Sequence, residues 1–404
     1  MLKNRKEELV YFILLMLLFT VYEYEILKSY SNLVFDTTVS AYSGYFYPAM
    51  ALMFILCVFI IIREPFLSRK LNSNSFVYFY ARYLLYIYVI GLIGSLFIVD
   101  LSGVSVNFFR TSFPLLFFVV VYILSLKIKD EKKQLFIFAI SFLILVYDYY
   151  ITYQQRNVFV VVNAQTITSY FILYLLPLLL CARSRIVKIL FCVVVTIVVL
   201  SSAKKAGTIA LIAGLYVYFL VSSLAKADSK GGILKFVIIF VVMLIVAYGI
   251  NYWFASSDSV IAERMSRLDE EGVGSRTVIW KIVLNRIINS NPIALLFGHG
   301  YDAVGLLSKD HLGSHNDFLE VLYDFGIIAF CAYCAMYVKL FTKVRRLIKC
   351  HSIYAAPLGM SLTILLIESM SSQIVTAPFF GVMFSMTWAY IFAKTDIEHK
   401  KINK

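Results

Sequence analysis

Ionisable residues and glycines gather in one stretch of this chain, residues 255–315, within an otherwise apolar sequence. The stretch ends at His315, and Asn316, Asp317 and Glu320 follow closely. Imidazole titrates near neutrality, so it can take a proton from a hydroxyl group, and a nearby carboxylate could orient its ring. We expect Asp317 and Glu320 to come too early in a helix to be deeply buried. From this residue alone, a histidine that caps the start of an interfacial helix is a better explanation than a catalytic base, so a catalytic role needs further support.

Three cations, Arg276, Lys204 and Lys205, suit a diphosphate group. Arginine offers a planar fork of donors that matches phosphate oxygens, and lysine adds a compact charge. Arg276 stands at the expected start of a helix, where a positive charge opposes the helix dipole, and this unfavourable position indicates a ligand. For the two lysines, contact with lipid headgroups is an equally good explanation.

A glycine-rich turn, Gly298-His299-Gly300, could bring the backbone close to a ligand. The turn lacks the GxxxxGK[ST] spacing of a nucleotide-binding loop, and the histidines lack an HExxH-like spacing, so we predict no cofactor and no metal. Glu368 and its serine neighbours form a polar end to an apolar run and could line a sugar-binding cavity. The candidate cavity residues are Gly298, His299, Gly300, Asn316, Glu320 and Glu368.

The composition indicates a membrane protein. Hydrophobic residues make up 61% of the chain, charged residues make up 15%, and the mean hydropathy is +0.82. A soluble domain has roughly 45–50% apolar and about 25% charged residues. Apolar runs that can cross ~30 Å of hydrocarbon recur along the chain, so we predict an all-α polytopic protein with one membrane domain over 1–404. The predicted spans, about twelve by this length rule, are 8–28, 44–62, 76–99, 113–128, 134–151, 166–182, 186–202, 206–224, 233–254, 316–341, 353–371 and 374–393.

The distribution of lysine and arginine predicts the sidedness of these spans. With the N-terminus inside, the inner loops carry most of the positive charge and the outer loops carry little. Both termini are then cytoplasmic, and residues 255–315 form one large external loop between the ninth and tenth spans. Lys204 and Lys205 break the pattern, because they lie in a very short outer connection. The same distribution explains the net charge of +13 without a nucleic-acid partner.

Within the large loop we expect an amphipathic helix over about 276–289. Ser275 can cap it, and Pro292 and the glycines that follow end it. A helix that rests on the membrane surface, held there by Trp280 and isoleucines, is compatible with a catalytic role. Elsewhere, the short connections near 201–208 and 370–376 fit either a tight hairpin or a single long helix.

Several short motifs follow one another in a fixed order: Ser275-Arg276 before Trp280, Asn291-Pro292, Gly298-His299-Gly300, and Ser314-His315-Asn316-Asp317-Phe318-Leu319-Glu320 before Gly326. Their order, spacing and sidedness resemble the shared C-terminal region of the O-antigen polymerase and O-antigen ligase superfamily. Upstream, Ser201-Ser202-Ala203-Lys204-Lys205-Ala206-Gly207 resembles the S-R-G-A-type segment of that family, with lysine where arginine is usual. The motifs cover a minor part of the chain, but the layout of spans around one large outer loop fits as well.

The resemblance implies a metal-independent glycosyltransferase of the membrane-embedded GT-C type, on the outer face of the cytoplasmic (inner) cell membrane. Its donor and acceptor would be oligosaccharides on undecaprenyl diphosphate, and a chain-length regulator protein would be a candidate partner besides the membrane lipids. By the same resemblance, His315 is the base that activates the acceptor hydroxyl group. Arg276 and Lys205 (or Lys204) hold the diphosphate leaving group, although lysine lacks the bidentate geometry of arginine.

The family contains more than one function. A polymerase would join lipid-linked repeat units into O-antigen, capsular or exopolysaccharide, whereas a ligase would transfer the finished glycan to lipid A-core. The scarcity of charge and the many Phe and Tyr residues (34 and 29) favour the polymerase. A flippase for lipid-linked oligosaccharides is the alternative from another class, and it predicts charged residues deep within several spans and no concentrated outer loop.

Overall fold

The computed structural model describes residues 8–22, 46–63, 76–98, 101–128, 130–154, 159–202, 204–225, 241, 276–307, 313–372, 374 and 378–402. Their regular elements are helices and this described part contains no strand, which confirms the predicted all-α class. The helices are α2 (Phe46–Arg63), α4 (Phe76–Ile98), α5 (Leu101–Lys127), α6 (Glu131–Gln154), α7 (Phe159–Leu179), α8 (Arg185–Ser201), α9 (Lys205–Leu224), α12 (Pro292–Phe297), α13 (Asp317–Lys349), α14 (Ala355–Ser371) and α15 (Pro378–Ile402), with a 3-10 turn, η1, at Gly305–Leu307. Helices also cover 8–22 and 276–288.

Several of these helices have the length and composition of membrane spans. Within the described residues, Glu131–Tyr153, Lys205–Leu224 and Asp317–Lys349 are long and apolar enough to cross a membrane, although the last of these is interrupted at Gly326. Shorter apolar helices cover Glu8–Tyr22, Ala51–Arg63, Phe79–Ile90, Ser112–Lys127, Thr168–Leu179 and Ala355–Ser371. The chain is therefore a polytopic membrane protein. Apart from residue 241, the predicted ninth span, 233–254, lies outside the described residues, and the total of about twelve spans stays a prediction.

The two short connections that the sequence left open are both breaks between separate helices. α8 ends at Ser201 and α9 begins at Lys205, while α14 ends at Ser371 and α15 begins at Pro378. At the first break the Ser202 N–H still donates to the Val198 carbonyl oxygen (3.1 Å), which closes the last turn of α8. A single long helix is therefore excluded at both places.

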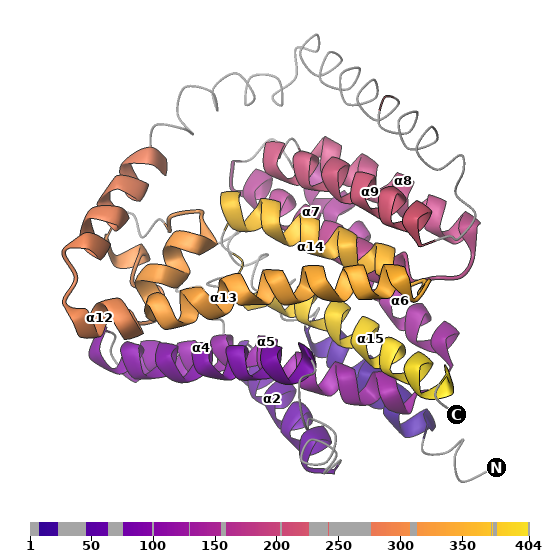
Figure 1. The fold of residues 1–404 in the computed structure, drawn as a ribbon, viewed down its shortest axis with the longest axis horizontal. Helices are drawn as coiled ribbons and strands as arrows, with labels where there is room; N and C mark the ends of the chain where they lie inside the picture. The colour runs from indigo at the N-terminus through magenta and orange to yellow at the C-terminus, as the bar shows by residue number, and fades with distance from the viewer. Residues whose placement is uncertain are drawn as a thin grey trace. The chain divides into compact units, whose positions relative to one another are not determined.

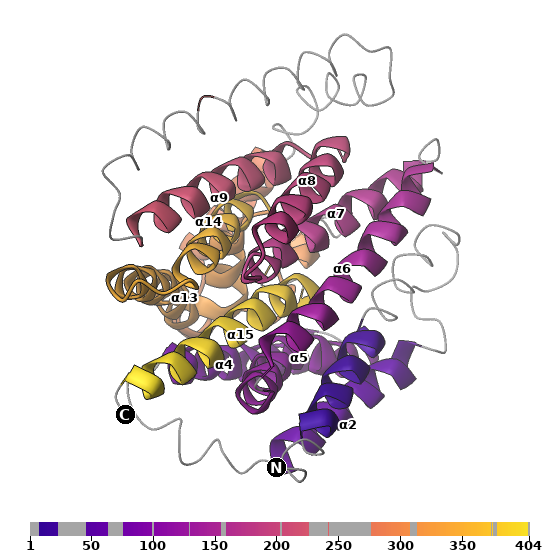
Figure 2. The same ribbon diagram turned by 90° about the vertical axis from the view of Figure 1, so that its right-hand side faces the viewer.

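The chain divides into two compact units. Unit 1 comprises 1–82, 112–202 and 379–404, and unit 2 comprises 83–111 and 203–378. In unit 1, α7 packs beside both α6 and α8 (Figure 2). Large aromatic side chains fill this core, as where Trp388 packs edge-on to Tyr80 with ring centroids 5.0 Å apart. The packing of unit 1 thus depends on aromatic residues from segments distant in the sequence.

Unit 2 carries the described part of the large loop with α13 and α14, and its framework is the pair α9 and α14 (Figure 1). The two helices approach closely at glycines. A Cβ atom on Gly214 would lie 3.0 Å from the Ile364 side chain, and one on Gly359 would lie 3.3 Å from Val217. Small residues at contacts of this kind are typical of helix pairs in membranes, where van der Waals packing drives association.

Helix α13 reverses its direction at Gly326, where the backbone has φ 78 and ψ 178. The Phe318 ring lies 5.5 Å from the Tyr333 ring, measured between centroids. In a straight helix these residues would be roughly 22 Å apart along the axis. Residues 317–325 therefore fold back along the part of α13 that follows Gly326. This corrects the predicted span 316–341, which the reversal divides into two segments.

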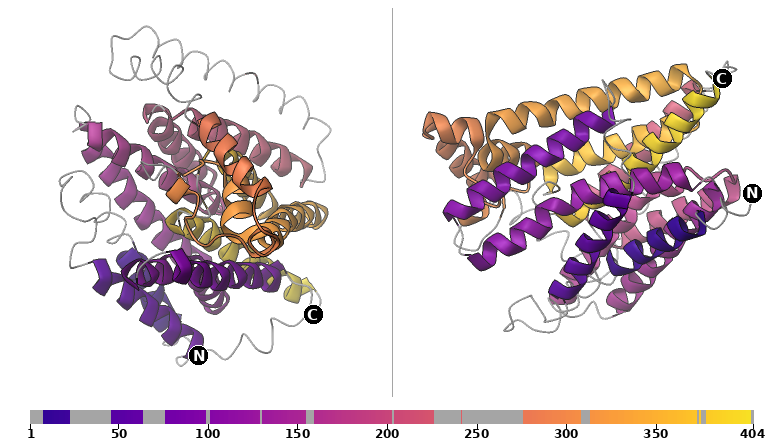
Figure 3. Two further views of the ribbon diagram at one scale, coloured as in Figure 1. Left: turned by 90° about the vertical axis from the view of Figure 1, so that its left-hand side faces the viewer. Right: turned by 90° about the horizontal axis from the view of Figure 1, so that it is seen from below.

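The described part of the large loop gathers at the end of α13 where this reversal occurs (Figure 3). α12 packs against α13, and the 276–288 helix contributes to the same group of elements. The described part of the loop, 276–307, is therefore folded against the first part of α13.

Candidate active site

His315 lies in the connection that enters α13, and its backbone is left-handed (φ 52). Hydrogen bonds fix the residue before it. The Trp280 indole N–H donates to the Ser314 carbonyl oxygen (2.7 Å), and the Glu320 carboxylate accepts from the Ser314 N–H (2.7 Å) and hydroxyl group (3.0 Å). The Asn316 side chain accepts from the first N–H groups of α13 and so caps that helix. A left-handed residue other than glycine costs roughly 1–2 kcal/mol, and these bonds hold His315 in that conformation.

The two carboxylates that follow His315 are buried, contrary to the expectation from sequence, with exposed fractions of 0% for Asp317 and 1% for Glu320. Asp317 accepts hydrogen bonds from the Ile374 N–H (2.8 Å) and the Tyr333 hydroxyl group (3.3 Å). For Asp317, the reversal of α13 contributes to this burial, because it brings Tyr333 of a later turn against the carboxylate. Both carboxylates thus hold the chain around His315, and no described residue makes a hydrogen bond to the His315 ring.

The surroundings of His315 are positively charged. Burial, and then the charges of Arg276 and Lys204, lower the pKa of His315 to about 4. The structure thereby brings together three residues that the sequence singled out from distant positions. At neutral pH the ring is uncharged, so one of its nitrogens can accept a proton.

The cations of this site stand at helix starts. Lys204 is the N-cap of α9 and makes no side-chain capping hydrogen bond, and Lys205 is the first residue of that helix. Arg276 is the first described residue of the 276–288 helix, and its side chain is exposed. The N–H groups and the dipole at a helix start already favour an anion, and nearby lysine or arginine adds to this field. The arrangement is suited to a ligand with several negative charges.

The helix predicted at 276–289 is confirmed at 276–288. Its buried Val283 packs in a cluster with Ala303, Val304 and Tyr323, and Ile279 and Ile287 pack against the same cluster. Because Trp280 is bonded to Ser314, this face of the helix is turned toward the His315 connection. The helix thus fixes the position of Arg276 relative to His315.

The glycine turn packs against the chain itself. Gly298 has φ 83, and a Cβ atom there would clash with the Asp324 carbonyl oxygen. A Cβ atom on Gly326 would likewise clash with the Leu296 carbonyl oxygen. The Gly300 N–H donates to the Asp324 carbonyl oxygen (2.9 Å). Gly298 and Gly326 are thus needed where the turn crosses the reversal of α13, and the approach of a ligand to this turn stays a prediction.

The His299 ring packs against, and lies within hydrogen-bond distance of, the surrounding chain. Its ring stacks on the Tyr323 ring, with centroids 4.1 Å apart. Its Nδ1 lies 3.0 Å from the Tyr323 carbonyl oxygen, and its Nε2 lies 3.3 Å from the Ser290 hydroxyl oxygen. Both ring nitrogens are engaged, so this imidazole joins the loop to α13.

Asp324 is a structural residue that the sequence analysis missed. Its buried carboxylate accepts hydrogen bonds from the Asp302 N–H (3.1 Å) and the Val304 N–H (3.0 Å), and so holds the turn after the glycines. A signal was available, because a carboxylate within a predicted span is a candidate for a specific role by default.

Glu368, a candidate cavity residue, lies fully buried in α14. The hydroxyl group of its neighbour Ser369 is 2.7 Å from that of Tyr333 and 2.8 Å from that of Tyr337. Glu368 thus stands beside the polar group that joins α13 to α14, and its role in a sugar cavity stays a prediction. Among the residues that the structure describes, no group of His, Cys, Asp and Glu side chains is arranged to hold a metal ion. His311 lies outside those residues.

Comparison with known families gives one match, and it covers this site. Residues 189–334 match a family described as O-antigen ligase. The matched segment contains Lys204, Arg276 and His315, the residues that the structure brings together. No curated protein shows significant similarity to the chain.

Proposed function

We propose that the chain is a member of the O-antigen ligase and polymerase superfamily, on the basis of the match over 189–334, and that it is a polysaccharide polymerase. It would transfer a growing glycan from undecaprenyl diphosphate to a lipid-linked repeat unit on the outer face of the cytoplasmic membrane. One observation supports the proposal above all. His315 is uncharged, the chain beside it is fixed by hydrogen bonds, and the charges of Arg276 and Lys204 act on its pKa. A base beside an anion site is what transfer from a diphosphate donor requires.

The reaction uses each part of this site. The acceptor hydroxyl oxygen attacks the anomeric carbon of the donor while His315 takes the hydroxyl proton. The bond between that carbon and the diphosphate oxygen breaks, and the electron pair leaves with the diphosphate. Arg276, Lys204 and the N–H groups at the start of α9 stabilise the departing charge. The products are a longer glycan and undecaprenyl diphosphate, with the proton on His315.

Binding of the donor also prepares the base. Burial, and then the charges of Arg276 and Lys204, lower the pKa of His315 to about 4, which makes the ring a weak base. A bound diphosphate offsets both positive charges, so it raises the pKa of His315 toward the range where imidazole is an effective base. The histidine thus becomes a stronger base when a donor is present.

The depth of the site suits a lipid-linked donor. The Tyr333 hydroxyl group bonds both to Asp317, close after His315, and to Ser369 near the end of α14. His315 is therefore level with the end of a helix that we predict to span the membrane. The diphosphate of a lipid carrier occupies this interfacial level while its isoprenoid chain stays in the hydrocarbon.

Replacing His315 tests the reaction. We expect His315→Ala to abolish polymer in cells while the amount of protein in the membrane stays unchanged. With purified protein in lipid, release of undecaprenyl diphosphate should fall on the order of 10²–10⁴-fold. Polymer of normal length in this variant contradicts the proposal.

A ligase is the second candidate, because the matching family is described as O-antigen ligase. The phenotype of a deletion strain separates the two functions. Loss of a polymerase leaves single repeat units on the final acceptor, whereas loss of a ligase leaves long glycan on the lipid carrier. A flippase predicts a third outcome, in which the repeat unit is trapped inside the cell.

A further inference from the structure

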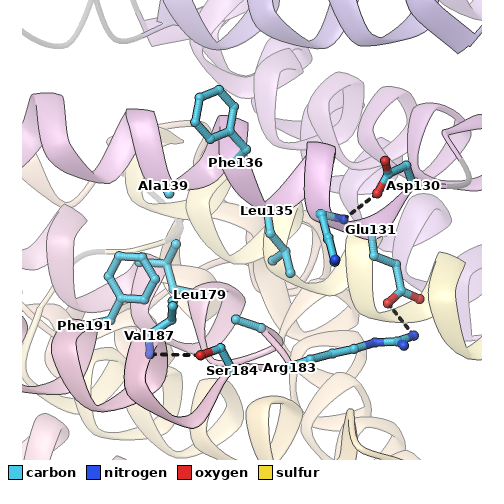
Figure 4. Close-up of a pocket in the computed structure, with 12 residues that line it drawn as sticks. Asp130, Glu131, Leu135, Phe136, Ala139, Leu179, Arg183, Ser184, Val187 and Phe191 are labelled. Carbon is cyan, nitrogen blue, oxygen red and sulfur yellow. Dashed lines mark hydrogen bonds and ion pairs between the residues drawn. The ribbon is translucent and has the colours of Figure 1, made fainter.

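Unit 1 contains a groove that the proposed chemistry does not use. It lies between the start of α6 and the connection from α7 to α8 (Figure 4). Its volume is about 710 Å³. Sites for small molecules have volumes of roughly 300–1,000 Å³, so the groove can hold a ligand or part of one.

The walls of the groove are apolar. Ala139 forms part of its wall on α6, and Val187 and Phe191 form part of it on α8. Phe136 also lines it and is exposed over 60% of its surface, so the groove is continuous with the apolar surface that the helices present to lipid. Such walls favour a hydrocarbon chain.

The mouth of the groove carries charges of both signs. Asp130, Glu131, Lys132 and Arg183 line it. The Arg183 guanidinium group donates to the Glu131 carboxylate at 3.0 Å, so the mouth is bridged between two segments of the chain (Figure 4). Two acids and two bases suit a headgroup that itself carries one charge of each sign.

The predicted sidedness gives the source of such a ligand. The connections at 127–133 and 183–188 are both rich in lysine and arginine, which predicts that they face the cytoplasm. A groove between them opens at the inner leaflet of the membrane. Lipids with one phosphate and one amine are zwitterionic, and their acyl chains match the apolar walls.

We propose that this groove binds one phosphatidylethanolamine molecule of the inner leaflet. Its phosphate lies toward Arg183 and Lys132, its ammonium group lies toward Asp130 and Glu131, and one acyl chain follows the wall past Ala139. The proposal does not depend on the proposed function, because the groove belongs to unit 1 and the reaction site belongs to unit 2.

The test is native mass spectrometry of the whole protein with phosphatidylethanolamine or phosphatidylglycerol of identical acyl chains. Ala139→Trp fills the groove. Leu143→Trp is its control, because Leu143 lies one turn further along α6, is 61% exposed, and is not among the residues that line the groove. We expect the wild type and Leu143→Trp to retain one phosphatidylethanolamine and Ala139→Trp to lose it.

Milder variants protect the test against misfolding of Ala139→Trp. Arg183→Gln and Glu131→Gln change only the mouth, and each should weaken phosphatidylethanolamine retention roughly two- to fivefold, as expected for exposed charge contacts. Equal retention by Ala139→Trp and Leu143→Trp overturns the groove as the binding site. If both Trp variants fail to fold, unchanged retention in the two mouth variants overturns it instead. Equal or stronger retention of phosphatidylglycerol overturns the choice of a zwitterionic headgroup.

Discussion

His299 and His315 belong to the same large loop, yet their surroundings differ in almost every respect. His299 stacks on an aromatic ring, and both of its ring nitrogens have partners. His315 has fixed neighbours on either side, but its ring makes no hydrogen bond with any described residue and faces two cations. The hydrogen bonds of the His299 ring contribute to the stability of the fold. The His315 ring has a fixed backbone but no such bonds, so its nitrogens are available to a substrate. The two histidines should therefore separate stability from activity.

The largest contrast is between His315→Ala and His299→Ala. His315→Ala should lower the rate on the order of 10²–10⁴-fold with little change in thermal stability. His299→Ala should reduce the free energy of unfolding by about 1–3 kcal/mol and leave most activity per folded molecule. Transfer assays and thermal unfolding of both purified variants measure the contrast. Equal loss of activity in the two would mean that the histidines do not differ in role.

The next effect concerns the cations. Arg276→Gln and Lys204→Gln should each lower kcat/KM by up to about 10²-fold, since each removes a charge that stabilises the leaving group. Lys281→Gln is the matched control, because Lys281 is an exposed cation on the same helix as Arg276. Its kinetics should stay close to those of the wild type. An equally large loss of kcat/KM in Lys281→Gln would show that positive charge attracts the anionic donor in general, without a specific role for Arg276 or Lys204.

A smaller effect is expected for the residue that connects the two sides of the site. Trp280→Phe keeps an aromatic ring but removes the indole N–H that donates to Ser314. A slight misplacement of the base should then lower kcat by about tenfold. KM for the donor should change little, because Arg276 and Lys204 remain. A change in KM alone would show that Trp280 acts on donor binding.

The smallest effect is a displacement of the pH profile. Burial and two cations lower the pKa of His315 to about 4, so the base is deprotonated and active in the free enzyme above that pH. Removing the positive charge in Arg276→Gln raises the pKa, and the acid limb of kcat/KM should move to higher pH. In the wild type, the acid limb of kcat should lie above that of kcat/KM, because the bound diphosphate offsets the cations. If the acid limbs of kcat and kcat/KM coincide, the bound diphosphate does not raise the pKa of His315.

The sequence predicted local elements better than the contacts that hold the site together. The charge pattern singled out Lys204 and Lys205 where topology does not require them. In the structure Lys204 is the N-cap of α9 and Lys205 is its first residue, and the charge of Lys204 acts on the pKa of His315. The helical spacing predicted the 276–288 helix, because a periodic apolar face is a local property of the chain. The classification as an all-α membrane protein followed from composition for the same reason.

The burial of Asp317 and Glu320 was not predictable in this way. The burial of Asp317 depends on the reversal at Gly326, which brings Tyr333 against it, and Glu320 is bonded to Ser314 in the connection before α13. The role of Gly298 likewise depends on Asp324, a partner that is distant in the chain and visible only in the fold. Local patterns do not reveal contacts that a change of chain direction creates.

The reversal at Gly326 also sets the height of the reacting groups relative to the lipid. In a straight helix, Asp317 would lie roughly 24 Å beyond Tyr333, well out in the water, whereas in the protein the two side chains touch. The lipid-linked donor that we propose would then diffuse in two dimensions to the protein and would need no extraction from the bilayer. A short-chain, water-soluble analogue of the donor would lose this high surface concentration, even with every contact to its diphosphate intact.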